Sequence, residues 1–153
     1  EFSAMGGAFI GGEGDYVTLF EPNALELEKE GYVYVVASIG ELGGIVPYTS
    51  YMARKSFIED NKELIKKFTT AIQKGIDYVH NHTDEEVAKA IKNQFPDTSV
   101  KDIAKVVKRY RGIDAWPKTT DFTEDSFNHL QDIMIENGTL ESKVPYNKLI
   151  YHE

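Results

Sequence analysis

The sequence predicts an α/β fold that is rich in helices, and two patterns along the chain support this prediction. Residues 16–20 and 32–37 are rich in β-branched and aromatic side chains, and a short segment with helical character separates them. This order of strand, helix and strand is typical of two parallel strands joined by a crossover. From Ser56 onward, apolar residues recur at helical spacing almost to the end of the chain.

Local signals predict where the amino-terminal elements begin and end. Residues 3–14 are small and glycine-rich, which fits a short helix that ends in a turn. After the first strand, Glu21-Pro22 acts as a stop, because proline cannot extend a ladder and restricts the residue before it. Asn23 is the expected cap of the next helix, and Gly31 is its expected end.

The segment after the second strand is predicted to be a hinge. Gly40, Gly43 and Gly44 make the chain flexible there, and residues 46–53 have the pattern of an extended segment. We therefore expect residues 45–55 to cross between two parts of the fold.

Four helices are predicted after this hinge. Capping-box spacing marks two of their starts, Ser56 with Glu59 and Thr83 with Glu86. The first helix has an apolar stripe, which we expect to be buried, and an opposite face that is rich in lysine. The stripe consists of Leu64, Ile65, Phe68, Ile72, Ile76 and Val79, and the lysine face of Lys62, Lys66, Lys67 and Lys74.

Three shorter helices follow, at about 84–94, at about 100–110, and before a stop at Asn137-Gly138. Their inward-facing residues are Val87, Ala88 and Ile91 in the second helix, Ile103, Val106, Val107 and Tyr110 in the third, and Phe127, Leu130, Ile133 and Met134 in the last. Two strands are few for a doubly wound sheet beside these helices, so we expect further strands upstream and interpret the chain as a fragment.

Composition and charge exclude several kinds of site. The formal net charge is −8 and the basic residues lie mainly on helix faces, so no continuous cationic track for nucleic acid is present. The absence of cysteine excludes disulfides, thiol nucleophiles and thiolate metal ligands. His80 and His82, two residues apart on a helix, point away from one another and form no metal site with Asp84. We expect no cofactor, no metal and no nucleic-acid partner.

Two features concern the location of the protein. No run of about 18 apolar residues is present, so the sequence predicts no transmembrane helix. The chain begins at Glu1 without an initiator methionine, and we expect a leader to lie upstream of it.

Short motifs along the chain occur in the order found in one protein family. They are Gly11-Gly12-Glu13-Gly14-Asp15 before the first strand, Glu21-Pro22 after it, Gly31-Tyr32-Val33-Tyr34-Val35-Val36, Gly44-Ile45-Val46-Pro47-Tyr48-Thr49, Arg109-Tyr110-Arg111 with Trp116, Gly138-Thr139-Leu140 and Val144-Pro145-Tyr146. Together they cover nearly the whole chain. The chain resembles the carboxy-terminal part of the substrate-binding proteins of ABC importers, in the group that binds sulfonates, taurine, nitrate and thiamine precursors.

The resemblance implies part of a two-lobed type II periplasmic-binding-protein fold. Residues 1–44 would belong to lobe two, residues 45–55 would cross between the lobes, and residues 56–153 would form carboxy-terminal helices that pack on lobe one. The lobes of such a protein close on a small molecule, which is then delivered to an ABC permease in the membrane. The implied location is extracytoplasmic, either periplasmic or lipid-anchored to the outer face of the cell membrane, and the implied protein is not an enzyme.

Glu21 is the first candidate for a ligand contact, because ligands of open α/β sheets lie beyond the carboxyl ends of strands. A carboxylate suits a ligand with N–H donors, such as an aminopyrimidine, and opposes a sulfonate or nitrate unless a cation pairs with it. The alternative role of Glu21 is to cap the following helix. We therefore expect a thiamine-precursor pyrimidine as the ligand, ahead of sulfonate, taurine or nitrate.

Four further residues are candidate ligand contacts. Gly11 and Gly12 could present backbone N–H groups to an anion, although such glycines also serve tight turns. Phe20 and Tyr48 could stack on a planar ligand, with core packing as the alternative.

Two other functions remain as alternatives. One is a ligand-sensing domain, in which a lobe of this kind is joined to a signalling module. The other is a thiamine-pyrimidine-synthesising enzyme of the same group, but that branch depends on a cysteine-rich motif and this chain has no cysteine. The sequence also leaves open self-association of the chain through an exposed strand edge.

Overall fold

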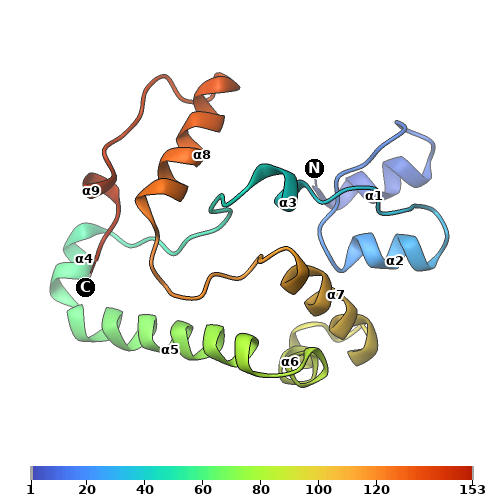
Figure 1. Ribbon diagram of the computed structural model, residues 1–153, viewed down its shortest axis with the longest axis horizontal. Helices are drawn as coiled ribbons and strands as arrows, with labels where there is room; N and C mark the ends of the chain where they lie inside the picture. The colour runs from blue at the N-terminus through green and yellow to red at the C-terminus, as the bar shows by residue number, and fades with distance from the viewer. Residues whose placement is uncertain (1, 153) are drawn as a thin grey trace. The chain divides into compact units, whose positions relative to one another are not determined.

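The computed structural model describes residues 2–152 and is built from helices joined by loops and extended segments (Figure 1). The helices are α1 (Phe2–Ile10), α2 (Asn23–Lys29), α3 (Ile39–Gly43), α4 (Lys55–Asp60), α5 (Lys62–Asn81), α6 (Asp84–Ile91), the 3-10 helix η1 (Lys92–Gln94), α7 (Val100–Gly112), α8 (Glu124–Glu136) and α9 (Tyr146–Leu149).

The chain divides into two compact units. The first unit consists of the described residues up to Ser38 together with Asn81–Ala115, and it contains α1, α2, α6, η1 and α7. The second unit consists of Ile39–His80 and the described residues from Trp116 onward, and it contains α3, α4, α8, α9 and nearly all of α5. Each unit therefore combines two segments that are far apart in the sequence.

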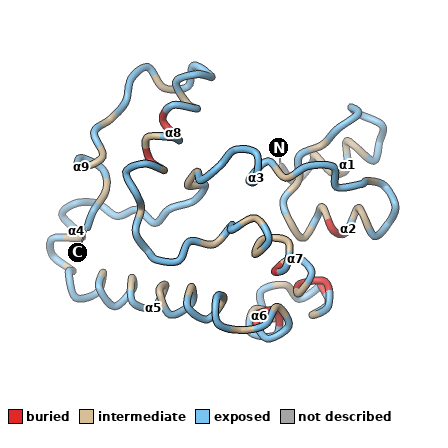
Figure 2. The backbone as a smooth tube through the Cα atoms, viewed as in Figure 1, coloured by how far each residue is buried: buried red, intermediate tan, exposed pale blue. Residues whose placement is uncertain are grey.

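The core of the first unit lies where α6 packs on α7 (Figure 2). Val87, Ala88, Ile103 and Val107 are at most 4% exposed, and Leu25 of α2 is 3% exposed. Burial of the α6 and α7 side chains supplies the apolar contribution that holds these two helices together. The predicted inward faces of α6 and α7 are thus confirmed at these positions.

The starts of α6 and α7 are capped by side chains. Thr83 and Glu86 form a reciprocal capping box at α6, as the sequence predicts. At α7 the side chain of Ser99 accepts a hydrogen bond from the backbone N–H of Asp102. These bonds satisfy N–H groups that have no partner inside a helix.

Glycine ends two of the helices in the predicted way. Gly31 has φ 83°, and its N–H donates to the carbonyl of Glu28, while Tyr32 N–H donates to the carbonyl of Leu27. Gly138, with φ 77°, ends α8 through the equivalent pair of backbone hydrogen bonds. A left-handed residue is required at this position of the motif, and glycine adopts that conformation without steric cost.

In the second unit, two glutamine side chains hold segments of backbone against helices. Gln131 of α8, 4% exposed, accepts from Val144 N–H at 2.6 Å and donates to the Val144 carbonyl at 3.3 Å. Gln73 of α5 donates to the Lys118 carbonyl and accepts from Thr120 N–H, each at 3.1 Å. An amide side chain carries both an acceptor and donors, so it can satisfy a backbone N–H and a backbone carbonyl at the same time.

Aromatic contacts complete the packing around α8. Phe127 is 8% exposed, and its ring lies between those of Phe122 and Tyr146, at centroid distances of 6.0 and 5.8 Å. The Tyr146 hydroxyl donates to the carbonyl of Phe122. These edge-on arrangements match the preference of aromatic quadrupoles, and they fix α9 beside α8.

The helix-rich character expected from the sequence is confirmed, but the predicted strands are not formed. Within residues 2–152 no β-strand is present, and residues 16–20 and 32–37 have no regular helix or ladder. A strand is stabilised by hydrogen bonds to a neighbouring strand, so β propensity alone does not create one.

Other local predictions are also wrong in detail. Gly40 and Gly43, expected in a flexible stretch, lie in the helix α3. The helix expected from Ser56 is divided at Asn61 into α4 and α5, and α4 has no side-chain cap, because it starts at Lys55 and places Ser56 inside its first turn. Asn23 is the first residue of α2 and not its cap, a consequence of the helix starting directly after Pro22.

A further wrong detail concerns the apolar stripe of α5. None of its six predicted residues is buried, and Leu64 and Phe68 remain 54% and 42% exposed. Only part of the stripe is covered within the second unit, where the Tyr51 ring meets the Phe68 ring edge-on at a centroid distance of 4.8 Å.

Candidate functional site

The side chain of Glu21 is only 10% exposed and lies at the turn before α2. Its Oε2 accepts a hydrogen bond from Leu25 N–H at 2.9 Å, so the carboxylate caps α2. Its Oε1 accepts from Nη1 of Arg109 at 2.6 Å. Its backbone N–H donates to the Tyr110 hydroxyl at 3.3 Å. Glu21 is therefore held at its backbone and at both oxygens of its side chain.

Arg109 connects two carboxylates. Its Nη1 binds Glu21 and its Nη2 binds Glu28 of α2, and its own side chain is 34% exposed. Burial acts to lower the pKa of Arg109, but the hydrogen bonds and charges of Glu21 and Glu28 outweigh it, and the pKa is raised. The guanidinium stays charged, and its planar fork suits two acceptors at once.

Tyr110, which follows Arg109 on α7, binds the backbone of Glu21. Burial raises the pKa of the Tyr110 phenol, with a further contribution from the charge of Glu21. The phenol is therefore neutral at physiological pH, and its oxygen accepts the Glu21 N–H.

A second ion pair joins the same two helices. Lys29 of α2 donates to Oδ2 of Asp102 on α7 at 2.7 Å, and the Ser99 hydroxyl donates to the same oxygen at 2.6 Å. The hydrogen bond from Lys29, followed by that from Ser99, lowers the pKa of Asp102. The contact between α2 and α7 thus carries several charged hydrogen bonds.

Gly11 and Gly12 lie at the carboxyl end of α1. Gly11 N–H donates to the Gly7 carbonyl, Gly12 N–H to the Phe9 carbonyl, and Glu13 N–H to the Ala8 carbonyl. Gly12 has φ 95°, as the closing residue of such a helix end requires. The turn role is thus visible in the structure, whereas a ligand role for these two glycines stays a prediction.

The two aromatic candidates belong to different units. Phe20, 46% exposed, directly precedes Glu21 in the first unit. Tyr48, 74% exposed, lies in the extended segment of the second unit. Stacking of either ring on a ligand stays a prediction.

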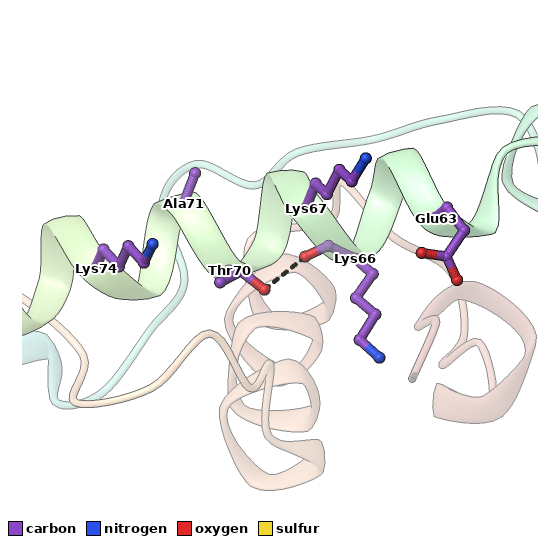
Figure 3. Close-up of a pocket in the computed structure, with 6 residues that line it drawn as sticks. All are labelled: Glu63, Lys66, Lys67, Thr70, Ala71 and Lys74. Atoms are coloured by element: carbon purple, nitrogen blue, oxygen red, sulfur yellow. Dashed lines mark hydrogen bonds between the residues drawn. The ribbon is translucent and has the colours of Figure 1, made fainter.

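A shallow hollow runs along one face of α5 (Figure 3). Its lining residues are Glu63, Lys66, Lys67, Thr70, Ala71 and Lys74, so all come from a single helix. This is the lysine-rich face expected from the sequence, and its open form gives a small molecule little surface to contact.

Within residues 2–152 no group of three or more His, Cys, Asp or Glu side chains is placed to hold a metal ion. No helix of this range combines the length and the apolar character needed to cross a membrane.

Sequence reasoning assigned no role to Arg109, although it noted the Arg109-Tyr110-Arg111 motif. Arg109 is separated from Glu21 by 88 positions, and only the fold brings them together. The sequence offered one signal for Arg109. This charged residue lies two positions after Val107, on a helix that buries both Val107 and Ile103.

Comparison with known proteins identifies the family. The family model described as NMT1/THI5 like matches residues 2–86. All 153 residues align with the protein YtlA of Bacillus subtilis (strain 168), named provisionally as a binding protein, at 39% identity. The chain spans 46% of the length of that relative. No solved structure matches the chain. The match over more than half of the sequence confirms the predicted resemblance, and the chain belongs to the NMT1/THI5 like family.

Proposed function

We propose that this chain is part of the solute-binding component of an ABC importer. Membership of the NMT1/THI5 like family and the relative named as a binding protein support this proposal. The protein would be extracytoplasmic, would capture a small molecule between two lobes, and would deliver it to a permease in the membrane. Closure of the lobes would follow from contacts that both make with the same ligand.

The proposal assigns parts of the chain to the lobes. Residues 1–44 would belong to lobe two, residues 45–55 would form the crossing, and residues 56–153 would supply helices that pack on lobe one. Asn81–Ala115 are the exception, because they form one compact unit with the described residues up to Ser38. The candidate ligand contacts are then Glu21 with Phe20, Gly11 and Gly12 on one lobe, and Tyr48 at the crossing.

The favoured ligand is a thiamine-precursor pyrimidine, and the fixed carboxylate of Glu21 is the observation that carries this choice. A carboxylate offers about four lone-pair positions. One bond from Leu25 and one from Arg109 engage Oε2 and Oε1, so each oxygen keeps capacity for an N–H donor of a ligand. Capping of α2 and ligand recognition are therefore compatible roles.

The charge around Glu21 supports the same ligand class. Glu21 and Glu28 carry two negative charges, and Arg109 carries one positive charge between them. This group of three side chains is net negative. It favours a cationic or N–H-rich ligand and repels a sulfonate or nitrate.

A thermal-shift titration of the full-length gene product tests the ligand. The compounds are an aminopyrimidine precursor, taurine, an alkanesulfonate and nitrate. We expect the midpoint of unfolding to rise with the concentration of the pyrimidine alone, because only a ligand that binds the folded state stabilises it. A rise with an anion alone would overturn the pyrimidine assignment and leave Glu21 as a helix cap.

A pair of variants tests the contact itself. Glu21→Gln keeps the shape of the side chain but removes its charge, and we expect it to weaken pyrimidine binding by roughly tenfold or more, the loss of a charged hydrogen bond. Glu26→Gln removes an exposed carboxylate of α2 as the matched control. Equal affinities of the two variants, measured by isothermal titration calorimetry, would contradict a ligand role for Glu21.

A further inference from the structure

Arg109 and Tyr110, which are consecutive residues of α7, both bind Glu21, which precedes α2. Arg109 holds the side chain of Glu21 through Oε1 at 2.6 Å, and Tyr110 holds its backbone N–H at 3.3 Å. The remaining carboxylate oxygen is bound by Leu25 N–H. The position and the rotamer of Glu21 are thereby restricted by three separate contacts.

Capping of α2 does not require this arrangement. The bond from Leu25 N–H to Oε2 is sufficient for a cap, and it comes from within the same turn. Attachment of α2 to α7 does not depend on it either. The pair between Lys29 and Asp102 and the pair between Arg109 and Glu28 also join α2 to α7.

Preorganisation explains the additional contacts. A carboxylate that recognises a ligand binds more tightly when its rotamer is fixed before the ligand arrives, because less conformational entropy is lost on binding. Arg109 holds Oε1 of the carboxylate through a charged hydrogen bond, and Glu28 holds the other arm of the guanidinium in place. The neutral phenol of Tyr110 holds the backbone without adding charge.

We propose that Arg109 and Tyr110 are positioning residues, which orient Glu21 for recognition of the N–H donors of the ligand. This inference rests on the proposed function, in which Glu21 contacts an aminopyrimidine. Neither residue needs to touch the ligand. Their effect on affinity passes through Glu21.

A double-mutant cycle on the full-length gene product tests this coupling, with the aminopyrimidine as the titrated compound. We expect Arg109→Met to weaken binding roughly tenfold, comparable to the loss of one charged hydrogen bond. Arg109→Lys retains a positive charge but not the planar fork, and should recover part of the affinity. In the Glu21→Gln background, Arg109→Met should cause no further loss.

The chain offers a matched control and a milder variant. Arg111, also on α7, pairs with Asp84 and donates to the His82 carbonyl, so Arg111→Met removes a similar side chain without affecting Glu21. We expect it to leave affinity within about twofold of the unmodified protein. Tyr110→Phe removes one hydroxyl and should weaken binding severalfold. Urea unfolding of each variant identifies any variant that does not fold. If Arg109→Met does not fold, the affinities of Arg109→Lys and Tyr110→Phe test the positioning role.

The outcomes separate this inference from the proposed function. If Glu21→Gln leaves pyrimidine affinity unchanged, both are overturned. If Glu21→Gln weakens binding while Arg109 and Tyr110 variants bind normally, only the positioning role is overturned. Equal losses for Arg109→Met in both backgrounds would also overturn it, since the effect would then not pass through Glu21.

Discussion

Glu21 caps α2 in the structure, and the ligand contact that we propose for it is compatible with that role. Its position after an extended segment and before a helix was visible from neighbouring residues, and the helix-cap role is seen directly in the bond to Leu25. Its pairing with Arg109 was not visible, because the two residues are 88 positions apart. The pairing changes the electrostatic argument, since the cation that would admit an anionic ligand is present but is shared with Glu28.

Asp102 provides a prediction about pH at the scale of single residues. Its pKa is lowered in the folded protein, first by the hydrogen bond from Lys29. The associated stabilisation is therefore complete above the unfolded value, about 3.9, and is lost as pH falls through the lower folded value. We expect Lys29→Met to reduce the loss of stability between about pH 5 and pH 2.

Urea unfolding at a series of pH values measures this effect. The control is Lys101→Met, at an exposed position of α7, the helix that carries Asp102. The ion pair would have no role in acid stability if both variants gave the same dependence of unfolding free energy on pH as the unmodified protein.

At the scale of elements, two predicted capping boxes had different outcomes. Thr83 and Glu86 form the box at α6, whereas Ser56 lies inside the first turn of α4. The same spacing thus gave a capping box only where the first residue of the pair lies outside the helix. Thr83 does so, in an extended conformation with ψ 159°. Spacing identifies candidate caps, and the backbone conformation selects among them.

This difference gives a paired test. Thr83→Ala should lower the free energy of unfolding by about 1 kcal/mol, the usual contribution of a helix cap. Ser56→Ala should change it by less than about 0.5 kcal/mol, as for an ordinary surface substitution. Chemical denaturation of both variants checks the pair, and a larger effect at Ser56 than at Thr83 would contradict the capping assignment.

Helices and strands differed in how well they could be predicted. The apolar spacing of Ile103 and Val107, and of Val87 with Ala88, correctly indicated the buried faces of α7 and α6. Residues 32–37 have strong β propensity, yet Tyr34 and Val36 are 88% and 74% exposed and form no ladder. A helix satisfies its backbone internally, whereas a strand depends on a partner strand.

At the scale of the whole molecule, the two units have separate cores. In the first unit the core lies where α6 packs on α7, and in the second it surrounds Phe127 and Gln131 of α8. The division was not predicted, because each unit joins two distant segments of the chain. The periodicity of apolar residues within one segment does not indicate which other segment packs against it.

Separate cores predict a localised response to a core substitution. Val107→Ala in the first unit should lower the free energy of unfolding by about 2 kcal/mol, from lost burial and the cavity left behind. Ile133→Ala, at a site on α8 that is 38% exposed, should have a smaller effect. Hydrogen exchange should become faster in Asn81–Ala115 in the Val107 variant while the α8 amides are unchanged. Uniform acceleration across both units would show that they unfold together.

The sequence by itself determined α1, α2, α6, α7 and α8, the glycine helix ends, the cap at α6, the family, and the selection of Glu21 as a candidate contact. Each of these depends on residues within a few positions of one another, or on the order of motifs along the chain. Only the tertiary structure decided that Arg109 and Tyr110 hold Glu21, and that Lys29 pairs with Asp102 across 73 positions. These contacts arise from the docking of α2 on α7, and the distances between their atoms follow from packing, which no local pattern in the chain encodes.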